Sequence, residues 1–224
     1  RRTLVVDMDP QANAGSGLGR VRGSVEQSIY DVLVGRASLE DVVAPVEGLE
    51  LLDVVPSTRD LIAVEVELVD AEGRESVLKD ALEPLRHEYE YILVDCPPSL
   101  GLLTINALVA ADAVVVPLQC EYYALEGLTE LLGTIERVRA AYNPDLMVDG
   151  ILLTMFDKRN NLSRQVEAEV RRHFPDLVYS TVIPRNVRLS ESPSFGKPVL
   201  LHDIRSKGCK GYLRLAGELL EGAR

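Results

Sequence analysis

Short runs of consecutive apolar residues recur along the chain, without alternating polar positions. Four of these runs lie at residues 3–6, 91–94, 113–118 and 150–156, and a fifth candidate lies at 51–55. Continuous runs rich in Val, Ile and Leu are typical of strands that are buried on both faces, and such strands occur in parallel sheets. We therefore predict a mostly parallel sheet.

Between these runs, apolar residues recur at spacings of three and four, which is the period of an amphipathic helix. The stretches with this spacing are residues 26–34, 59–69, 76–87, 103–111, 125–142, 162–174 and 211–221. Strands that alternate with helices predict an α/β fold with a doubly wound sheet flanked by helices. No Pro-, Gly- or Ser-rich linker divides the chain, so we predict a single domain over residues 1–224.

Acidic residues follow several of the predicted strands. Asp7 and Asp9 follow the first, Asp95 follows the run at 91–94, and Glu121 and Asp157 follow two later runs. In open α/β sheets, ligands bind in the crevice at the carboxyl ends of the strands. Polar residues also cap strands where the chain leaves the core, but the recurrence over several strands favours a metal-assisted site.

The segment LVVDMDPQANAGSGLG, at residues 4–19, carries the first chemical motif. A carboxylate at a strand end can hold a water molecule for Mg²⁺ or for attack on a substrate. Pro10 fixes the turn, and Asn13 with the glycines at 15, 17 and 19 is suited to a close-fitting loop. This segment predicts a ligand-binding loop directly after the first strand.

The segment YILVDCPPSLG, at residues 91–101, carries the second motif. Its four apolar residues followed by Asp95 match the pattern by which nucleotide hydrolases place an acid beside Mg²⁺ at the end of a buried strand. In the loop that follows, Pro97 and Pro98 restrict the backbone, whereas Gly101 leaves it flexible. A switch that senses phosphate requires such a combination.

Together with PLQCEYYALEG at 117–127 and VIPRNVRLSESPSFGKPV at 182–199, these segments resemble the ParA/Soj family of chromosome- and plasmid-partition ATPases, a branch of the deviant Walker A group. The resemblance extends over essentially the whole chain. It implies a P-loop NTPase-like fold and a homodimer that forms with ATP and binds double-stranded DNA non-specifically. It also implies stimulation by a ParB-type DNA-binding partner.

The resemblance also implies roles for individual residues. The residue matching Asp9 positions the attacking water, and Asp95 is the Walker B acid. Asp7 lies beside the nucleotide and, with Asp95, is expected to hold Mg²⁺ through water. The adenine is expected to lie against Pro184, Arg185 and Asn186. ATP and Mg²⁺ are thus the expected cofactors. The alternative for these residues is a structural one, as strand caps and turn residues.

One family feature is absent from the 224 residues. A Walker A loop needs a Gly-rich turn followed by Lys and Ser or Thr. The pair Gly196-Lys197 is followed by Pro198, and no Gly lies five positions before Gly196. In the family, a strand, this loop and a helix precede the segment matching Leu4. We therefore expect that the chain is a partial domain, or that it does not hydrolyse ATP. Loss of a central strand would expose an interior edge of the sheet.

Charge is unevenly distributed. The net charge is −11, with −16 in residues 1–156 and +5 in residues 157–224. A non-specific DNA-binding protein needs a stripe of cations that neutralises phosphates. The candidates for this stripe are Arg171, Arg172, Arg188, Lys197, Arg205 and Lys207. The alternative is an ordinary solvated surface.

Composition limits the location and class of the protein. Of the 224 residues, 46% are hydrophobic, which is enough for a folded core, and no apolar run approaches 18 residues. We therefore expect no membrane association. Three cysteines in no paired spacing favour a reducing compartment. We expect a cytoplasmic, nucleoid-associated protein.

Two other functions compete with DNA partition. A MinD-type cell-division positioning ATPase would need a basic amphipathic C-terminal helix for the membrane. Residues 211–224 carry apolar positions, but Glu218 and Glu221 dilute the positive charge, which favours packing against the sheet. A non-hydrolysing remnant that binds DNA or a partner is the other alternative. Retention of Asp9, Asp95 and the segment at 184–186 argues against it.

Overall fold

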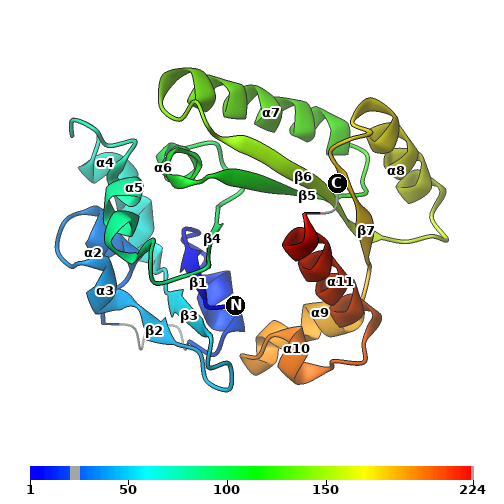
Figure 1. The fold of residues 1–224 in the computed structure, drawn as a ribbon, viewed down its shortest axis with the longest axis horizontal. Helices are drawn as coiled ribbons and strands as arrows, with labels where there is room; N and C mark the ends of the chain where they lie inside the picture. The colour runs from blue at the N-terminus through cyan, green and yellow to red at the C-terminus, as the bar shows by residue number, and fades with distance from the viewer. Residues whose placement is uncertain (21–25, 223–224) are drawn as a thin grey trace. The chain divides into compact units, whose positions relative to one another are not determined.

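The computed structural model describes residues 1–20 and 26–222, and it divides into two compact units, each with its own sheet (Figure 1). Unit 1 comprises Arg1–Ala111, Ala141–Pro144 and Pro193–Pro198. Unit 2 comprises Asp112–Ala140, Asp145–Ser192 and the chain from Val199 onward.

The sheet of unit 1 has four strands in the order β2-β3-β1-β4. The strands are β1 (Thr3–Asp7), β2 (Ala44–Pro45), β3 (Leu52–Val55) and β4 (Tyr91–Asp95). The central strand β1 is parallel to both β3 and β4, whereas the short β2 is antiparallel to β3. Leu4 and Val6 of β1 are fully buried, as expected for a strand covered on both faces.

Short helices surround this sheet. They are α1 (Asn13–Gly17), α2 (Ile29–Leu33), α3 (Leu39–Val42), η1 (Arg59–Ala63), α4 (Val64–Glu67), α5 (Val77–Leu82), η2 (Glu83–Leu85) and α6 (Leu102–Ala110). Ser28 begins α2 and Ser38 begins α3, each in a capping box with the acid three residues later. The helix expected at 26–34 therefore starts at Ile29. The single helix expected at 59–69 is a 3₁₀ helix followed by one α-helical turn.

The core of unit 1 joins the central strand to these helices. Its fully buried members include Leu4, Val6, Met8, Ile29, Val55, Leu61, Val64 and Leu78. Asn106 of α6 is also buried, and its amide group bonds the N–H of Leu78 (3.1 Å) and the carbonyl of Arg74 (2.8 Å). This polar contact fixes α6 to the start of α5.

The sheet of unit 2 has three parallel strands in the order β5-β6-β7. They are β5 (Ala113–Gln119), β6 (Met147–Phe156) and β7 (Val178–Pro184). The helices of the unit are α7 (Ala124–Ala141), α8 (Asn161–His173), α9 (Val187–Glu191), α10 (Val199–His202) and α11 (Lys207–Glu221). The 3₁₀ helix η3 (Ser192–Phe195) continues from α9, and all of it except Ser192 belongs to unit 1. α11 lies along β7 (Figure 1), where Leu215 is buried with Tyr179 and Ile183.

The predicted α/β class is confirmed, because both sheets are mostly parallel and carry helices between their strands. The five expected strands all form. Four of them begin within one residue of the predicted start, and β6 begins at Met147, three residues early. β2, β7 and the helices α1, α3, α9 and α10 were not predicted. The expectation of one domain stays a prediction. No helix in the described ranges is long and apolar enough to cross a membrane.

Candidate active site

The register of unit 1 brings two of the predicted acids together. Asp7 ends β1 and Asp95 ends β4, and the two residues are direct partners in the parallel pairing. Asp9 follows two residues after β1. The charges of Asp95 and Asp9 both raise the pKa of Asp7, and the charge of Asp9 raises that of Asp95. The three carboxylates therefore form one electrostatic cluster at the carboxyl end of the sheet.

Asp7 is fully buried, and both of its oxygens accept backbone hydrogen bonds. Oδ2 accepts from the N–H of Gly15 (2.9 Å) and Oδ1 from the N–H of Asp9 (3.2 Å). Burial is the largest effect on its pKa, and the two hydrogen bonds only partly oppose it, so the pKa rises to about 6. Asp7 thus anchors the loop between β1 and α1 while carrying a charge that its surroundings disfavour.

Asp9 has a more open position. It is half-buried, and Oδ1 accepts from the N–H of Gln11 (2.9 Å), while its backbone carbonyl accepts from the N–H of Ala12 (2.8 Å). Within the described ranges, Oδ2 has no hydrogen-bond partner. Ala12 has φ 53, a left-handed conformation that is uncommon for a residue with a side chain. The turn predicted from Pro10 therefore includes a second backbone constraint, at Ala12.

Asp95 lies at the exposed end of β4. Its pKa is raised mainly by desolvation within the surrounding protein, and the charge of Asp9 raises it further. In the following loop, the buried hydroxyl of Thr104 donates to the carbonyl of Ser99 (2.6 Å). Asp95 itself is bonded through its backbone carbonyl, which accepts from the N–H of Met8 (2.8 Å). The carboxylate thus remains available to a ligand.

The donor chemistry of this cluster fits Mg²⁺ held largely through water. In residues 1–20 and 26–222, no three His, Cys, Asp or Glu side chains lie close enough to hold a metal ion directly. Mg²⁺ usually keeps several of its waters and takes one or two protein carboxylates. Both oxygens of Asp7 are engaged with backbone, so Asp95 is the carboxylate that fits a direct or water-mediated contact.

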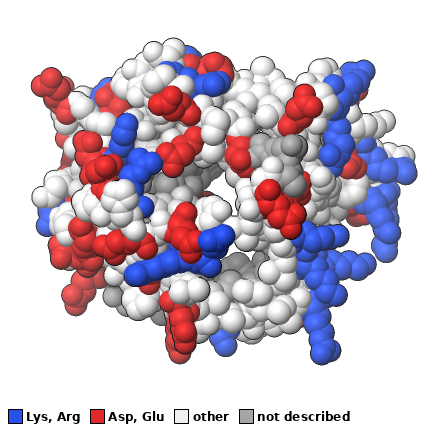
Figure 2. All heavy atoms as spheres, in the orientation of Figure 1, with Lys and Arg blue, Asp and Glu red and all other residues white. Residues whose placement is uncertain are grey.

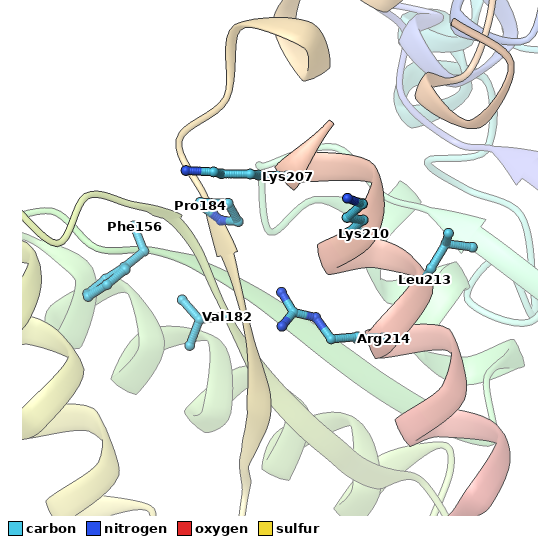
Figure 3. Close-up of a pocket in the computed structure, with 7 residues that line it drawn as sticks. All are labelled: Phe156, Val182, Pro184, Lys207, Lys210, Leu213 and Arg214. Atoms are coloured by element: carbon cyan, nitrogen blue, oxygen red, sulfur yellow. The ribbon is translucent and has the colours of Figure 1, made fainter. Parts of the chain in front are cut away.

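The segment expected to contact adenine lies in unit 2. Pro184 ends β7 and lines a pocket of about 530 Å³ (Figure 3). The other lining residues are Phe156, Val182, Lys207, Lys210, Leu213 and Arg214. Arg185 donates its backbone N–H to the carbonyl of Phe156 (3.0 Å), and Asn186 caps α9 by accepting from the N–H of Arg188 (3.0 Å). Whether this segment meets the acidic cluster of unit 1 stays a prediction.

The predicted DNA-binding cations fall into two groups. Arg171, Arg172 and Arg188 form ion pairs with Glu167 (3.2 Å), Glu169 (2.7 Å) and Glu191 (2.9 Å), and Arg188 also with Asp203 (3.4 Å). Arg205 and Lys207 have no ion-pair partner in the described ranges, and neither do Lys210 and Arg214. The intrahelical pairs could have been found from the sequence, because their spacing is i, i+3 or i, i+4. Arg214 was missed.

Lys197 differs from the rest of that set because it belongs to unit 1. It follows Gly196, which packs against Gly19, both glycines having positive φ. A Cβ at Gly19 would lie 3.2 Å from the carbonyl oxygen of Gly196. The other predicted cations belong to unit 2, where Figure 2 shows Lys and Arg gathered over α8 and over the segment from α9 to α11.

Comparison with known proteins gives a consistent answer. A family model described as an AAA domain matches residues 1–148. The chain is 58% identical to the chromosome partitioning protein ParA of Myxococcus xanthus, over 99% of this chain and 78% of that protein. It is 56% identical to the sporulation initiation inhibitor protein Soj of Bacillus subtilis, over 98% of this chain and 86% of that protein.

A solved structure extends the comparison to three dimensions. The cobyrinic acid a,c-diamide synthase of Mycobacterium smegmatis, with bound ADP and magnesium, superposes with a TM-score of 0.84 and 36% identity, covering 98% of this chain and 82% of that one. The fold is thus that of a nucleotide-binding α/β protein. The chain belongs to the ParA/Soj family of chromosome-partitioning ATPases.

Proposed function

We propose that the full-length protein hydrolyses ATP with Mg²⁺ to drive DNA partition. The observation that carries this proposal is the cluster of Asp7, Asp9 and Asp95 at one end of the sheet of unit 1. Burial of a charged carboxylate is costly and is typical of functional sites. A chain with a purely structural role would not need three mutually repelling acids there.

Each acid of the cluster has a distinct role in this proposal. Asp9 orients the attacking water, because its Oδ2 has no hydrogen-bond partner among residues 1–20 and 26–222. Asp95 holds Mg²⁺, directly or through water, and Asp7 fixes the loop through the N–H groups of Gly15 and Asp9. Mg²⁺, when bound, neutralises the charge that develops on the phosphates. Pro184, Arg185 and Asn186 contact the adenine.

The proposal is tested with full-length protein in which Asp9 is replaced. Asp9→Ala should bind ATP as the parent does but release phosphate at least about 100-fold more slowly, because a group acting on water is lost. Asp95→Asn should lose both Mg²⁺ dependence and turnover. Asp176→Ala is the matched control, since Asp176 is exposed and remote from the cluster along the chain. Hydrolysis by Asp9→Ala at the parent rate would refute the proposal.

The 224-residue chain is the second arm of this experiment. It contains no Gly-rich loop followed by Lys and Ser or Thr. Such a loop supplies several kcal/mol of transition-state stabilisation. We expect no phosphate release by these 224 residues above a heat-treated control, and release above that control would contradict the expectation.

We further propose that unit 2 binds double-stranded DNA without sequence preference. An arginine that is already paired with an acid must break that pair to neutralise a phosphate, so unpaired cations should contribute more. In full-length protein with ATP, Arg205→Ala/Lys207→Ala/Lys210→Ala should lower the log–log salt slope of binding by roughly 1 per lost contact. Arg171→Ala/Arg172→Ala/Arg188→Ala should lower it less. Unchanged slopes in both would place the DNA surface elsewhere.

Dimerisation with ATP and stimulation by a ParB-type partner complete the proposed cycle, in a cytoplasmic, nucleoid-associated protein. The family membership supports both. Molar mass from light scattering should double with ATP and Mg²⁺ and not with ADP, and the partner should raise phosphate release only when DNA is present. A MinD-type role at the membrane is disfavoured, because α11 uses Leu215 and Glu218 to pack on β7.

A further inference from the structure

The helix that follows the Asp95 loop receives its N-terminal cap from a distant residue. α6 begins after Gly101, which has no side chain to cap the helix. The first N–H of α6, from Leu102, instead donates to Oε1 of Glu65 (3.1 Å), a residue of α4 that is 37 positions away in the sequence. The carboxylate also complements the positive end of the helix dipole. Glu65 thus ties α4 to the loop at 96–101.

Gly101 makes room for this carboxylate. A Cβ at position 101 would overlap Oε1 of Glu65, and the three heavy atoms nearest to it all belong to Glu65. The backbone at Gly101 has φ −87, which any residue can adopt. Glycine here leaves room for the Glu65 carboxylate, the end of an exposed side chain that an added Cβ would displace, and it is not needed for backbone freedom.

Within the described residues, the loop at 96–101 is partly exposed. Pro98, Ser99 and Leu100 are exposed, whereas Pro97 is buried and its carbonyl accepts from the hydroxyl of Thr104 (3.5 Å). Within the loop, the hydroxyl of Thr104 donates to the carbonyl of Ser99 (2.6 Å), and this contact comes from α6 itself. The path from Asp95 to α6 therefore depends on where the first turn of α6 is held. The buried Leu103 and Asn106 hold the helix against the core, and Glu65 adds a contact from α4 to its first N–H.

We propose that Glu65 is a positioning residue for ATP hydrolysis. By capping α6 it fixes the loop at 96–101 and, through it, the carboxylate of Asp95. The inference rests on the proposed function of Asp95. Glu65 does not touch the reacting groups, and its loss should lower kcat while leaving the KM for ATP within twofold, because a displaced acid affects turnover more than nucleotide binding.

The test compares five variants of the full-length protein, four at positions 65 and 101 and one control. Glu65→Ala and Gly101→Ala should each lower kcat about tenfold, the first by removing the carboxylate and the second by displacing it. The double variant should be no slower than either single variant, because both remove the same contact. Glu65→Gln keeps an acceptor oxygen and should restore most of the rate. Glu72→Ala, an exposed acid of the same unit, should match the parent.

Hydrogen exchange at the amide of Leu102 supplies a readout independent of activity. Exchange should be faster in Glu65→Ala and Gly101→Ala and close to the parent in Glu65→Gln. Additive losses in the double variant, no rescue by glutamine, or kcat within twofold of the parent in Glu65→Ala would each overturn the inference. If Asp95→Asn hydrolyses ATP at the parent rate, it is the proposed function that fails. An essential Asp95 with a dispensable Glu65 refutes this inference alone.

Discussion

Two carboxylates, one in each unit, accept nearly the same hydrogen bonds, but their pKa values shift in opposite directions. Asp7 accepts from the N–H groups of Gly15 and Asp9, and its pKa is raised. Glu218 accepts from the N–H groups of Ser180 (2.6 Å) and Thr181 (3.0 Å), and its pKa is lowered. Two backbone hydrogen bonds therefore do not by themselves decide the pKa of an acid.

Burial and neighbouring charge account for the difference. For Asp7, burial is the largest effect, and the charges of Asp95 and Asp9 add to it. For Glu218, burial is the largest single effect too, but the hydrogen bonds from Ser180 and Thr181 together outweigh it, and no acid of the described residues adds to the effect of burial. We infer that Asp7 is kept at a cost to stability, as in a functional site, whereas Glu218 stabilises the fold.

The largest expected effect is on the pH dependence of folding stability, and it comes from Asp7. Its folded pKa of about 6 lies above its ordinary value of 3.8. The folded state therefore holds the proton more tightly, and the parent should lose roughly 3 kcal/mol of stability as pH rises from about 3.5 to 7. Asp7→Asn cannot titrate, so its stability relative to the parent should increase by that amount over this range.

This is measured by urea unfolding of both proteins with nucleotide and Mg²⁺ absent. Asparagine offers only one acceptor oxygen to the two N–H donors, so Asp7→Asn starts with a constant deficit that pH does not change. The informative quantity is the slope of the difference against pH. A flat difference between pH 3.5 and 7 would show that Asp7 titrates alike in both states.

A smaller effect is expected when Glu218 is truncated. Glu218→Ala leaves the N–H groups of Ser180 and Thr181 without their partner, at a cost of about 1–3 kcal/mol in the free energy of unfolding. It also uncovers part of β7, an edge strand of its sheet. Glu221→Ala, on the same helix, is the control and should stay within about 0.5 kcal/mol of the parent. Equal stabilities of the two variants would remove the structural role of Glu218.

The smallest effect concerns the titration of Glu218. Because its folded pKa is lowered, its stabilising contribution is present above its ordinary pKa and is lost as pH falls through the folded value. Between pH 5 and 3 the parent should lose slightly more stability than Glu218→Gln. Thermal unfolding of both proteins across this range checks the sign. A parent that becomes more stable on acidification, relative to Glu218→Gln, would contradict the comparison.

Features that depend on neighbours in the sequence could be predicted. The strands of the two sheets follow from continuous apolar runs, and the acids at the ends of β1 and β4 follow from parallel pairing. β7 escaped prediction because Ser180 and Thr181 interrupt its apolar pattern, and their N–H groups bond to Glu218. The cap on α6 escaped for a similar reason, since Glu65 and Leu102 meet only in the folded chain.

The position of β4 at the edge of its sheet offers a way to observe its surroundings. The N–H of Tyr91 donates to Arg2 at the start of β1, so by alternation the N–H groups of Ile92 and Val94 point away from β1. No strand of the described ranges covers that side, and Leu93 is 54% exposed. Deuterium uptake should therefore label alternate amides of β4 at two distinct rates. A strand that pairs with this edge would protect the N–H groups of Ile92 and Val94, and the two exchange rates would become similar. The rate at which such a strand pairs with β4 can therefore be measured by deuterium uptake alone.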